Sequence, residues 1–126
     1  MRSLPIYAAI ATAGLFLSAP ALAHPKLLSS TPAANASVAA PSRITLTFSE
    51  SLMPKLSGAE IVMTGMPGMP NHRMAVTGFQ TSTDADGKTL VLALARPLSA
   101  GSYQVAWHVV STDTHRVQGN LAFTVK

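Results

Sequence analysis

The sequence contains no cysteine among its 126 residues. No disulfide can therefore cross-link the folded chain, and no thiolate is available to bind a metal or to be oxidised by one. Charged residues are also scarce, at 11% of the chain, and the basic ones are spread along it rather than clustered. This distribution gives no indication of a nucleic-acid-binding surface.

A long apolar run is lacking as well, because the run at residues 6–17 is too short to span a membrane. It follows Arg2 and precedes Ala21-Leu22-Ala23, a small-x-small pattern. Together these features predict an export signal, residues 1–23, that is cleaved after Ala23. The mature chain, residues 24–126, then carries eight Lys/Arg against five Asp/Glu, and its length suits one domain.

The mature sequence has the period of β-strands and no helical period. Residues 43–49 alternate, which puts Ile44 and Phe48 on one face, and residues 102–110 alternate around Trp107. Further strands are expected at 60–64, 74–79, 89–95 and 119–125, with a loop at 29–41, a single helical turn at 52–56 and an Asp-Gly turn at 83–88. Short strands with Pro/Gly punctuation predict an all-β fold, a two-sheet Greek-key β-sandwich or barrel.

Four methionines and one histidine fall within residues 63–74: Met63, Met66, Met69, His72 and Met74. The glycines and prolines between them exclude a helix, so we expect a surface loop with exposed thioethers. Thioether sulfur and imidazole nitrogen suit the soft ion Cu(I), and the segment is a candidate Cu(I) site. The alternative is that the methionines pack beneath the loop or form an adaptable apolar contact patch.

Cleavage after Ala23 would create a free α-amine on His24, next to Pro25. An N-terminal histidine can chelate a metal through this amine and its ring Nδ1. Pro25 has no amide N–H, so the backbone of the second residue cannot supply a competing nitrogen ligand. Both groups of His24 lose their protons readily near neutral pH, and nitrogen ligands in a plane suit Cu(II).

A second pair of candidate ligands, Asp113 and His115, lies between the last two strands. In an extended segment these two side chains point the same way, so with His24 they would complete a Cu(II) site of three nitrogens and one oxygen. The ordinary alternative is a solvated turn in which the aspartate caps backbone N–H groups. Glu50, at the end of an earlier strand, could orient a ligand or simply face solvent. The fourth histidine, His108, is expected on the surface and is not assigned to metal.

Taken together, these motifs resemble the CopC family of periplasmic copper-resistance proteins, including the PcoC type. The resemblance covers the whole mature chain and rests on His24-Pro25, Phe48-Ser49-Glu50, the Met-rich run at 63–69, and Trp107 with Ser111-x-Asp113-Thr114-His115. It implies a cupredoxin-like (Ig-like) Greek-key barrel that binds copper without catalysis. It also implies Cu(II) at His24, Asp113 and His115, with Glu50 as an auxiliary group, and Cu(I) in the methionine loop.

The resemblance further implies a periplasmic monomer that carries or buffers copper. Its partners would be a CopD-like inner-membrane protein or a periplasmic multicopper oxidase. Two residues separate Met69 from His72 and one separates His72 from Met74. Because this spacing varies in the family, the choice among the five Cu(I) ligands stays open.

Two other classes of protein compete with a copper carrier. A copper monooxygenase can also use an N-terminal histidine brace on a β-sandwich, but it needs a flat aromatic face for its polysaccharide substrate. Only five aromatic residues follow Ala23, mostly at inward strand positions. A metal-free exported interaction module would use the methionine loop as an apolar patch.

Overall fold

The structure is a computed structural model that describes Ser3 and residues 24–126, so the predicted export signal lies outside the described residues apart from Ser3. The described elements are β1 (Leu27–Thr31), β2 (Ser37–Val38), β3 (Arg43–Phe48), the short 3-10 helix η1 (Pro54–Leu56), β4 (Gly58–Gly65), β5 (Met74–Val76), β6 (Phe79–Thr83), β7 (Thr89–Leu94), β8 (Gly101–Val110) and β9 (Arg116–Val125). No helix within this part of the chain is long and apolar enough to cross a membrane.

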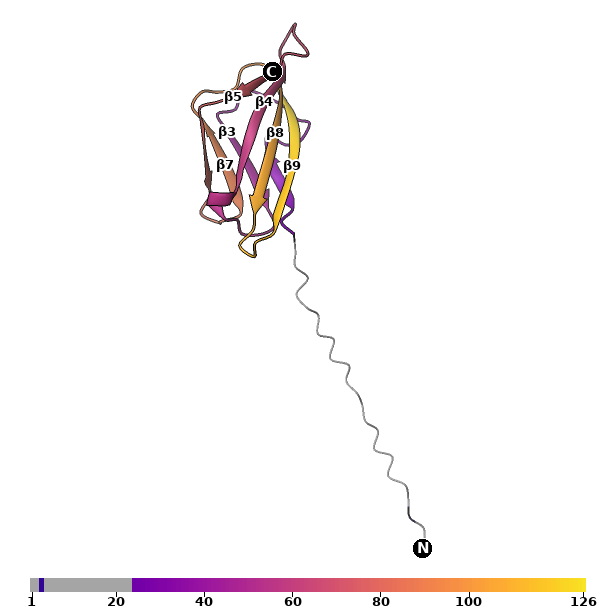
Figure 1. Cartoon of the computed structure of the whole chain (residues 1–126). Helices are drawn as coiled ribbons and strands as arrows, with labels where there is room; N and C mark the ends of the chain where they lie inside the picture. Colours follow the sequence, from indigo (N-terminus) through magenta and orange to yellow (C-terminus); the bar gives the residue numbers. More distant parts are fainter. Residues whose placement is uncertain (1–2, 4–23) are drawn as a thin grey trace.

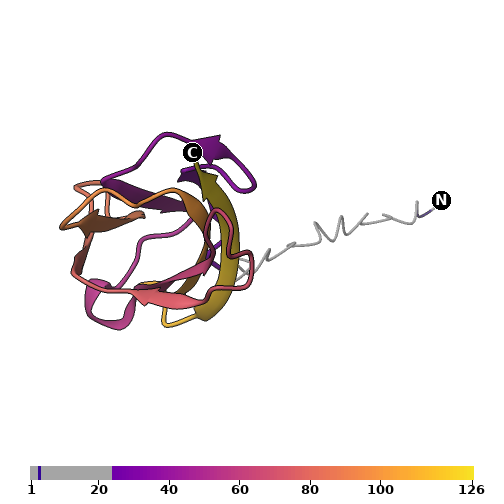
Figure 2. The same ribbon diagram turned by 90° about the horizontal axis from the view of Figure 1, so that it is seen from above.

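The strands form two sheets, with orders β1-β3-β7-β6 and β2-β9-β8-β4-β5. Neighbouring strands pair antiparallel except β2 with β9, which run parallel. Figure 1 shows the strands of both sheets running along the long axis, and the view down that axis in Figure 2 shows the strands surrounding a common interior. The predicted all-β sandwich or barrel is therefore confirmed.

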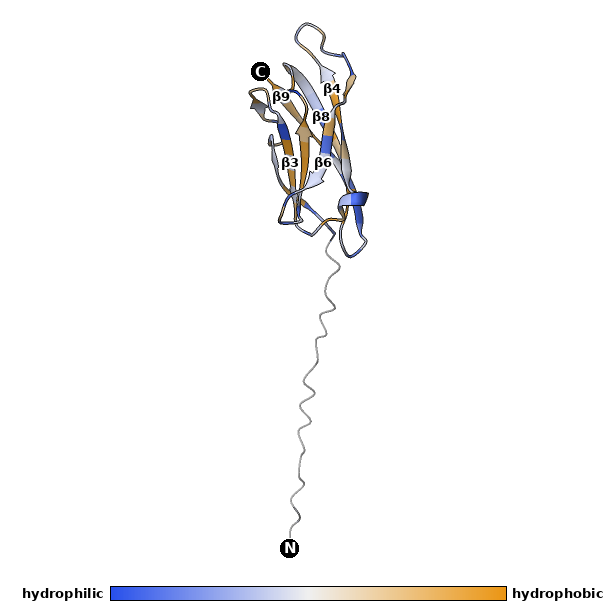
Figure 3. Ribbon diagram, turned by 90° about the vertical axis from the view of Figure 1, so that its left-hand side faces the viewer, coloured by the Kyte–Doolittle hydropathy of each residue, from blue (hydrophilic) through white to orange (hydrophobic). Residues whose placement is uncertain are grey.

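The core comes from the inward faces of the alternating strands. Phe48 of β3 is fully buried and its ring meets Trp107 of β8 edge to face at 5.0 Å, while Tyr103 stacks on Phe123 of β9 at 5.6 Å. Such aromatic pairs add to the burial energy of the two sheets. Figure 3 shows hydrophobic residues along β3 and β9 and a hydrophilic helical turn at η1.

Gly119 has no side chain, and this leaves room for the Trp107 ring in the core. The two residues are opposite each other in the β8–β9 ladder, and a Cβ on Gly119 would lie 2.5 Å from Trp107 Cζ2. Replacing a glycine by alanine within a strand ordinarily stabilises by about 0.5–1 kcal/mol. Here we expect Gly119→Ala to lower the free energy of unfolding by about 2 kcal/mol, because overpacking displaces the ring.

Denaturant unfolding of the mature protein measures this effect. Asn120→Ala is the matched control, since Asn120 is exposed on the same strand, and it should stay within about 0.5 kcal/mol of the parent. An unchanged unfolding midpoint for Gly119→Ala would contradict the close packing of the indole.

Three expectations about strand boundaries are wrong. Residues 29–41 are not simply a loop, because β1 extends to Thr31 and β2 pairs with β9 inside that segment. Residues 74–79 are not one strand, because β5 pairs with β4 in one sheet and β6 with β7 in the other. The last strand begins at Arg116 rather than at Gly119, since Arg116 already pairs with Val110.

Candidate metal centres

The segment that precedes β1 is fastened to the end of β3. Lys26 N donates to Ser49 Oγ at 2.9 Å, and Ser49 N donates to Lys26 O at 2.9 Å. Pro25 is buried, whereas His24 is exposed. The first described residues of the domain are thereby held beside the turn that joins β8 to β9, at the lower end of Figure 1.

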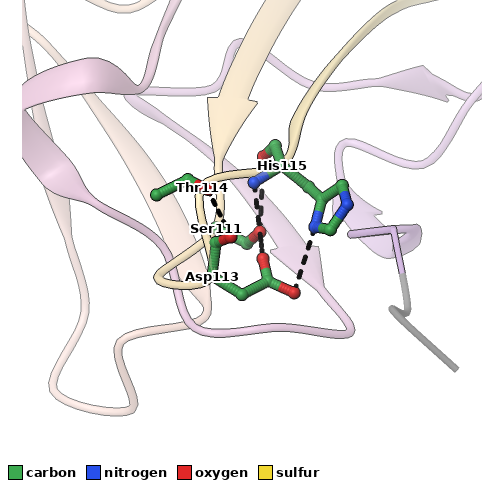
Figure 4. Close-up of polar contacts among 4 residues, drawn as sticks. All are labelled: Ser111, Asp113, Thr114 and His115. Carbon is green, nitrogen blue, oxygen red and sulfur yellow. Dashed lines mark hydrogen bonds and ion pairs between the residues drawn. The ribbon is translucent and has the colours of Figure 1, made fainter. Parts of the chain in front are cut away.

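That turn carries Asp113 and His115 (Figure 4). Ser111 N donates to His115 O at 2.9 Å, and Thr114 N donates to Ser111 O at 2.8 Å. Thr114 has a φ of 74°, in the left-handed region that a threonine rarely adopts, so the closed turn holds it there. The buried Ser111 hydroxyl donates to Asp113 Oδ1, which fixes the carboxylate within the turn.

The carboxylate and both histidines meet at this end. His115 Nδ1 lies 3.1 Å from Asp113 Oδ2, and the rings of His24 and His115 are 4.9 Å apart, centroid to centroid, in an edge-on arrangement. His115 Nδ1 is buried without a well-aligned hydrogen bond, so this ion-pair contact is its polar partner. A histidine whose one ring nitrogen faces a carboxylate presents the other nitrogen to a metal.

Side chains alone do not complete the cluster. Within the described residues, no three His, Asp or Glu side chains are arranged to hold a metal. Glu50 is half-buried at the same end, and no hydrogen bond in the described chain joins it to His24, Asp113 or His115. In the full-length chain the main-chain nitrogen of His24 is a peptide nitrogen, which does not supply a further donor.

Hydrogen bonding holds the Asp113 carboxyl in its ionised form. The Ser111 hydroxyl is the largest cause of its lowered pKa, His115 lowers it further, and partial desolvation opposes both. Because the folded-state pKa lies below the ordinary 3.8, the carboxylate stabilises the fold above that value. This stabilisation is lost as the pH falls through the lower, folded-state pKa.

Removing the Ser111 hydroxyl should raise the Asp113 pKa toward its ordinary value. We expect Ser111→Ala to do so, and the change can be followed by carbon-detected NMR titration of the side-chain carboxyl. Thr112→Ala is the control, since Thr112 is exposed and its side chain makes no hydrogen bond to Asp113 in the described chain. An unchanged titration in Ser111→Ala would show that the hydroxyl does not control this carboxylate.

The methionine segment is a tight hairpin rather than an open loop. Met66 N donates to Met69 O at 3.0 Å, and Met69 N donates back to Met66 O at 2.8 Å. Pro67 and Gly68 form the turn, and the φ of 80° at Gly68 suits the position after proline in a type II turn. Directly opposed residues project to the same face, so the thioethers of Met66 and Met69 share one side of the hairpin.

The remaining members of the methionine segment occupy different environments. Met63 and Met74 are also directly opposed, but Met63 is only 5% exposed whereas Met74 and Met69 are each 50% exposed. His72 is half-buried, and its backbone N–H donates to Met69 O at 3.2 Å. The expectation of exposed thioethers throughout is therefore wrong for Met63, which the alternation of β4 turns into the core.

The histidine cluster and the methionine hairpin lie at opposite ends of the barrel (Figure 1). Strand β8 runs from the methionine end to the histidine end of the barrel. Its second residue, Ser102, pairs with Gly65, and its last residue directly precedes Ser111. Its 10 residues span about 30 Å at roughly 3.3 Å per residue. No single ion can therefore contact both groups.

Comparison with known proteins identifies the family of this chain. The family model described as "CopC domain" matches residues 27–126. The chain belongs to the CopC domain family. It is 52% identical to "Copper resistance protein C" of Pseudomonas syringae pv. tomato, with 90% of each chain covered, and 49% identical to the protein of that name from Xanthomonas campestris pv. juglandis, with 93% of this chain and 91% of the relative covered.

Solved structures of CopC-type proteins share the fold. The crystal structure of PcoC, "a Methionine Rich Copper Resistance Protein from Escherichia coli", matches with a TM-score of 0.75 at 48% identity, covering 82% of this chain and 100% of PcoC. CopC from Methylosinus trichosporium OB3b matches with a TM-score of 0.65 at 30% identity, covering 82% of this chain and 94% of the other. The predicted family is thereby confirmed.

In this CopC-family chain the sequence motifs left two serines without a role. Ser111 orients Asp113, and Ser49 fastens the N-terminal segment. The available signal was position: a serine two residues before an aspartate is typical of a hydrogen-bonded turn. Ser49, which follows the end of β3, gave no such signal, because its partner, Lys26, is 23 residues away in the sequence.

Proposed function

We propose that this protein is a periplasmic copper-binding protein that carries or buffers copper for copper resistance and homeostasis. Its relatives named "Copper resistance protein C" and the structural likeness to PcoC support copper resistance as its role. Export with cleavage after Ala23 is part of the proposal, since a short apolar run is followed there by the small-x-small pattern Ala21-Leu22-Ala23. A CopD-like inner-membrane protein or a periplasmic multicopper oxidase would receive the copper, and the carrier would act as a monomer.

The observation that carries the proposal is the contact between His24 and His115. Residues 91 positions apart in the chain bring their rings to 4.9 Å, beside a carboxylate that faces His115 Nδ1 at 3.1 Å. In the proposed Cu(II) site, the His24 amine and ring, the His115 ring and the Asp113 carboxylate supply nitrogen and oxygen donors suited to Cu(II). Glu50 would act from the periphery.

A soft site for Cu(I) is proposed at the other end. Met66 and Met69 would bind through sulfur, because they share one face of the hairpin, and the exposed Met74 and half-buried His72 are additional donors. Met63 would enter the site only if its sulfur reached out of the core. Thioethers remain uncharged and unprotonated at neutral pH, so this site should depend less on pH than the histidine end.

Copper titration of the mature protein in each oxidation state tests the proposal. We expect one Cu(II) and one Cu(I) to bind, each without displacing the other. A protein that retained no copper on dialysis would instead be a metal-free interaction module.

A copper monooxygenase finds less support. Phe48, Tyr103, Trp107 and Phe123 are buried, and Phe79 packs against the core, so the described aromatics do not supply a flat binding face. The carrier should therefore not oxidise chitin or cellulose when loaded with copper and given peroxide. Turnover of either polysaccharide would overturn this choice.

A further inference from the structure

Charge is distributed unevenly along the barrel. All five acidic side chains of the chain lie toward the histidine end: Glu50 after β3, Glu60 in the first half of β4, Asp84 and Asp86 in the β6–β7 turn, and Asp113 after β8. Four exposed basic side chains occupy the methionine end: Arg43 at the start of β3, Arg73 before β5, Arg96 after β7, and Lys126 after β9. The methionine end is thus cationic, with no acidic side chain among the described residues there.

A hollow of about 410 Å³ opens at this cationic end, between β5 and the connection from β7 to β8. The larger apolar side chains of its lining are Met63, Met74, Val76, Leu94, Leu98 and Tyr103. Tyr103 donates its hydroxyl proton to Ser99 O at 2.7 Å, so the polar atom of this aromatic wall is already satisfied. Arg96 is the one charged residue in the lining. The hollow therefore presents hydrocarbon and thioether beside a positive charge.

We propose that the methionine end docks an acidic, methionine-bearing segment of the protein that exchanges copper with this one. The inference rests on the proposed function, because exchange of Cu(I) requires donors of matching softness on both sides. The arginines would attract the acidic residues and raise the association rate. The hollow beside Met74 would accept an apolar side chain from the same segment.

The shape of this surface favours a protein segment over other occupants. Recognition of anionic membranes by basic residues uses a dense cluster of about four to eight cations on one surface. Here the four basic residues stand on separate elements rather than in one dense cluster, and Arg96 lines a concavity, which fits an inserted side chain better than a flat bilayer. A second copy is disfavoured as well, because two cationic ends repel and the histidine end mixes its acidic residues with Lys26, Lys55, Lys88 and Arg116.

The test uses the copper-free mature protein, labelled with ¹⁵N, and a synthetic peptide in which aspartates alternate with methionines. We expect amide shifts confined to the hairpin and the lining of the hollow. Binding should weaken about tenfold in Arg73→Gln/Arg96→Gln and by a similar factor when salt is raised, since exposed charge pairs are screened. The matched control, Lys55→Gln/Lys88→Gln, removes the same charge at the other end and should change affinity by less than about twofold.

Several results would overturn the proposal. They are shifts at the histidine end, equal binding by the two double variants, equal binding of a lysine–methionine peptide, or binding of phosphatidylserine vesicles in place of the peptide. Self-association of the mature protein in sedimentation equilibrium that is abolished by the two arginine substitutions would point to a second copy instead.

Failure of docking can be distinguished from failure of the proposed function. The peptide titration needs no copper, while Cu(I) affinity is measured separately against a competing chelator. Arg73→Gln/Arg96→Gln should bind Cu(I) at least as tightly as the parent, because two positive charges have been removed near a cation.

Discussion

One glycine added before His24 of the mature chain is expected to remove tight Cu(II) binding, with a loss of affinity of roughly 1,000-fold, or about 4 kcal/mol. The added residue converts the α-amine into a peptide amide, which no longer offers a free electron pair and no longer closes a chelate ring with the histidine side chain. Competition titration of Cu(II) against a chelator of known affinity measures the loss. His24→Ala should have a similar effect, since it removes the ring instead.

Two controls separate this effect from a general disturbance. The same glycine added after Lys126 lies at the opposite end of the barrel and should leave Cu(II) affinity unchanged. His108→Ala removes a histidine that packs over Gly58 and makes no ring or ion-pair contact with His24, Asp113 or His115 among the described residues, and it should also leave Cu(II) affinity unchanged. Equal Cu(II) affinity in the N-terminally extended protein would mean that the amine is not a ligand, and the proposed site would be wrong.

Replacing both hairpin thioethers, Met66→Leu/Met69→Leu, is expected to weaken Cu(I) binding by about 100-fold, or roughly 3 kcal/mol. Leucine conserves volume and apolar character, so the hairpin should persist while two soft donors disappear. Cu(I) affinity measured under anaerobic conditions against a Cu(I) chelator reports the loss. Cu(II) binding should remain intact, because the histidine cluster lies at the other end.

The remaining methionines supply matched controls. Met53→Leu makes the same chemical change near η1, at the histidine end, and should leave Cu(I) affinity unchanged. Met63→Leu replaces a buried side chain and should cost less than about 1.5 kcal/mol of stability, with little effect on Cu(I). A loss of Cu(I) affinity in Met63→Leu as large as in the hairpin variant would show that the site reaches into the core.

Local alternation was enough to predict the strands that build the core. Ile44, Leu46 and Phe48 alternate in β3, as do Tyr103, Val105, Trp107 and Val109 in β8, and all are buried. The break between β5 and β6 could not be predicted in this way, because it depends on which sheet offers each half its backbone partners. Pairing between distant segments leaves no periodic signal in either one.

The candidate site residues also differ in how well the sequence predicted their positions. His24, Asp113 and His115 were proposed as one group from their chemistry, and the structure brings them together. Met63 was expected to be exposed because the glycines and prolines that follow it indicate a loop. The strand continues through Met63, however, and burial then follows from its position in the β4 ladder. Local composition cannot tell where a strand ends and a hairpin tip begins.

The length of β8 has a consequence for how copper would move when its oxidation state changes. An ion oxidised at the hairpin would find its preferred nitrogen and oxygen donors about 30 Å away, beyond the reach of any side-chain rearrangement. It would have to leave the molecule and be captured again, by the same copy or by another. Redistribution after oxidation would then compete with every other copper acceptor in the surrounding solution.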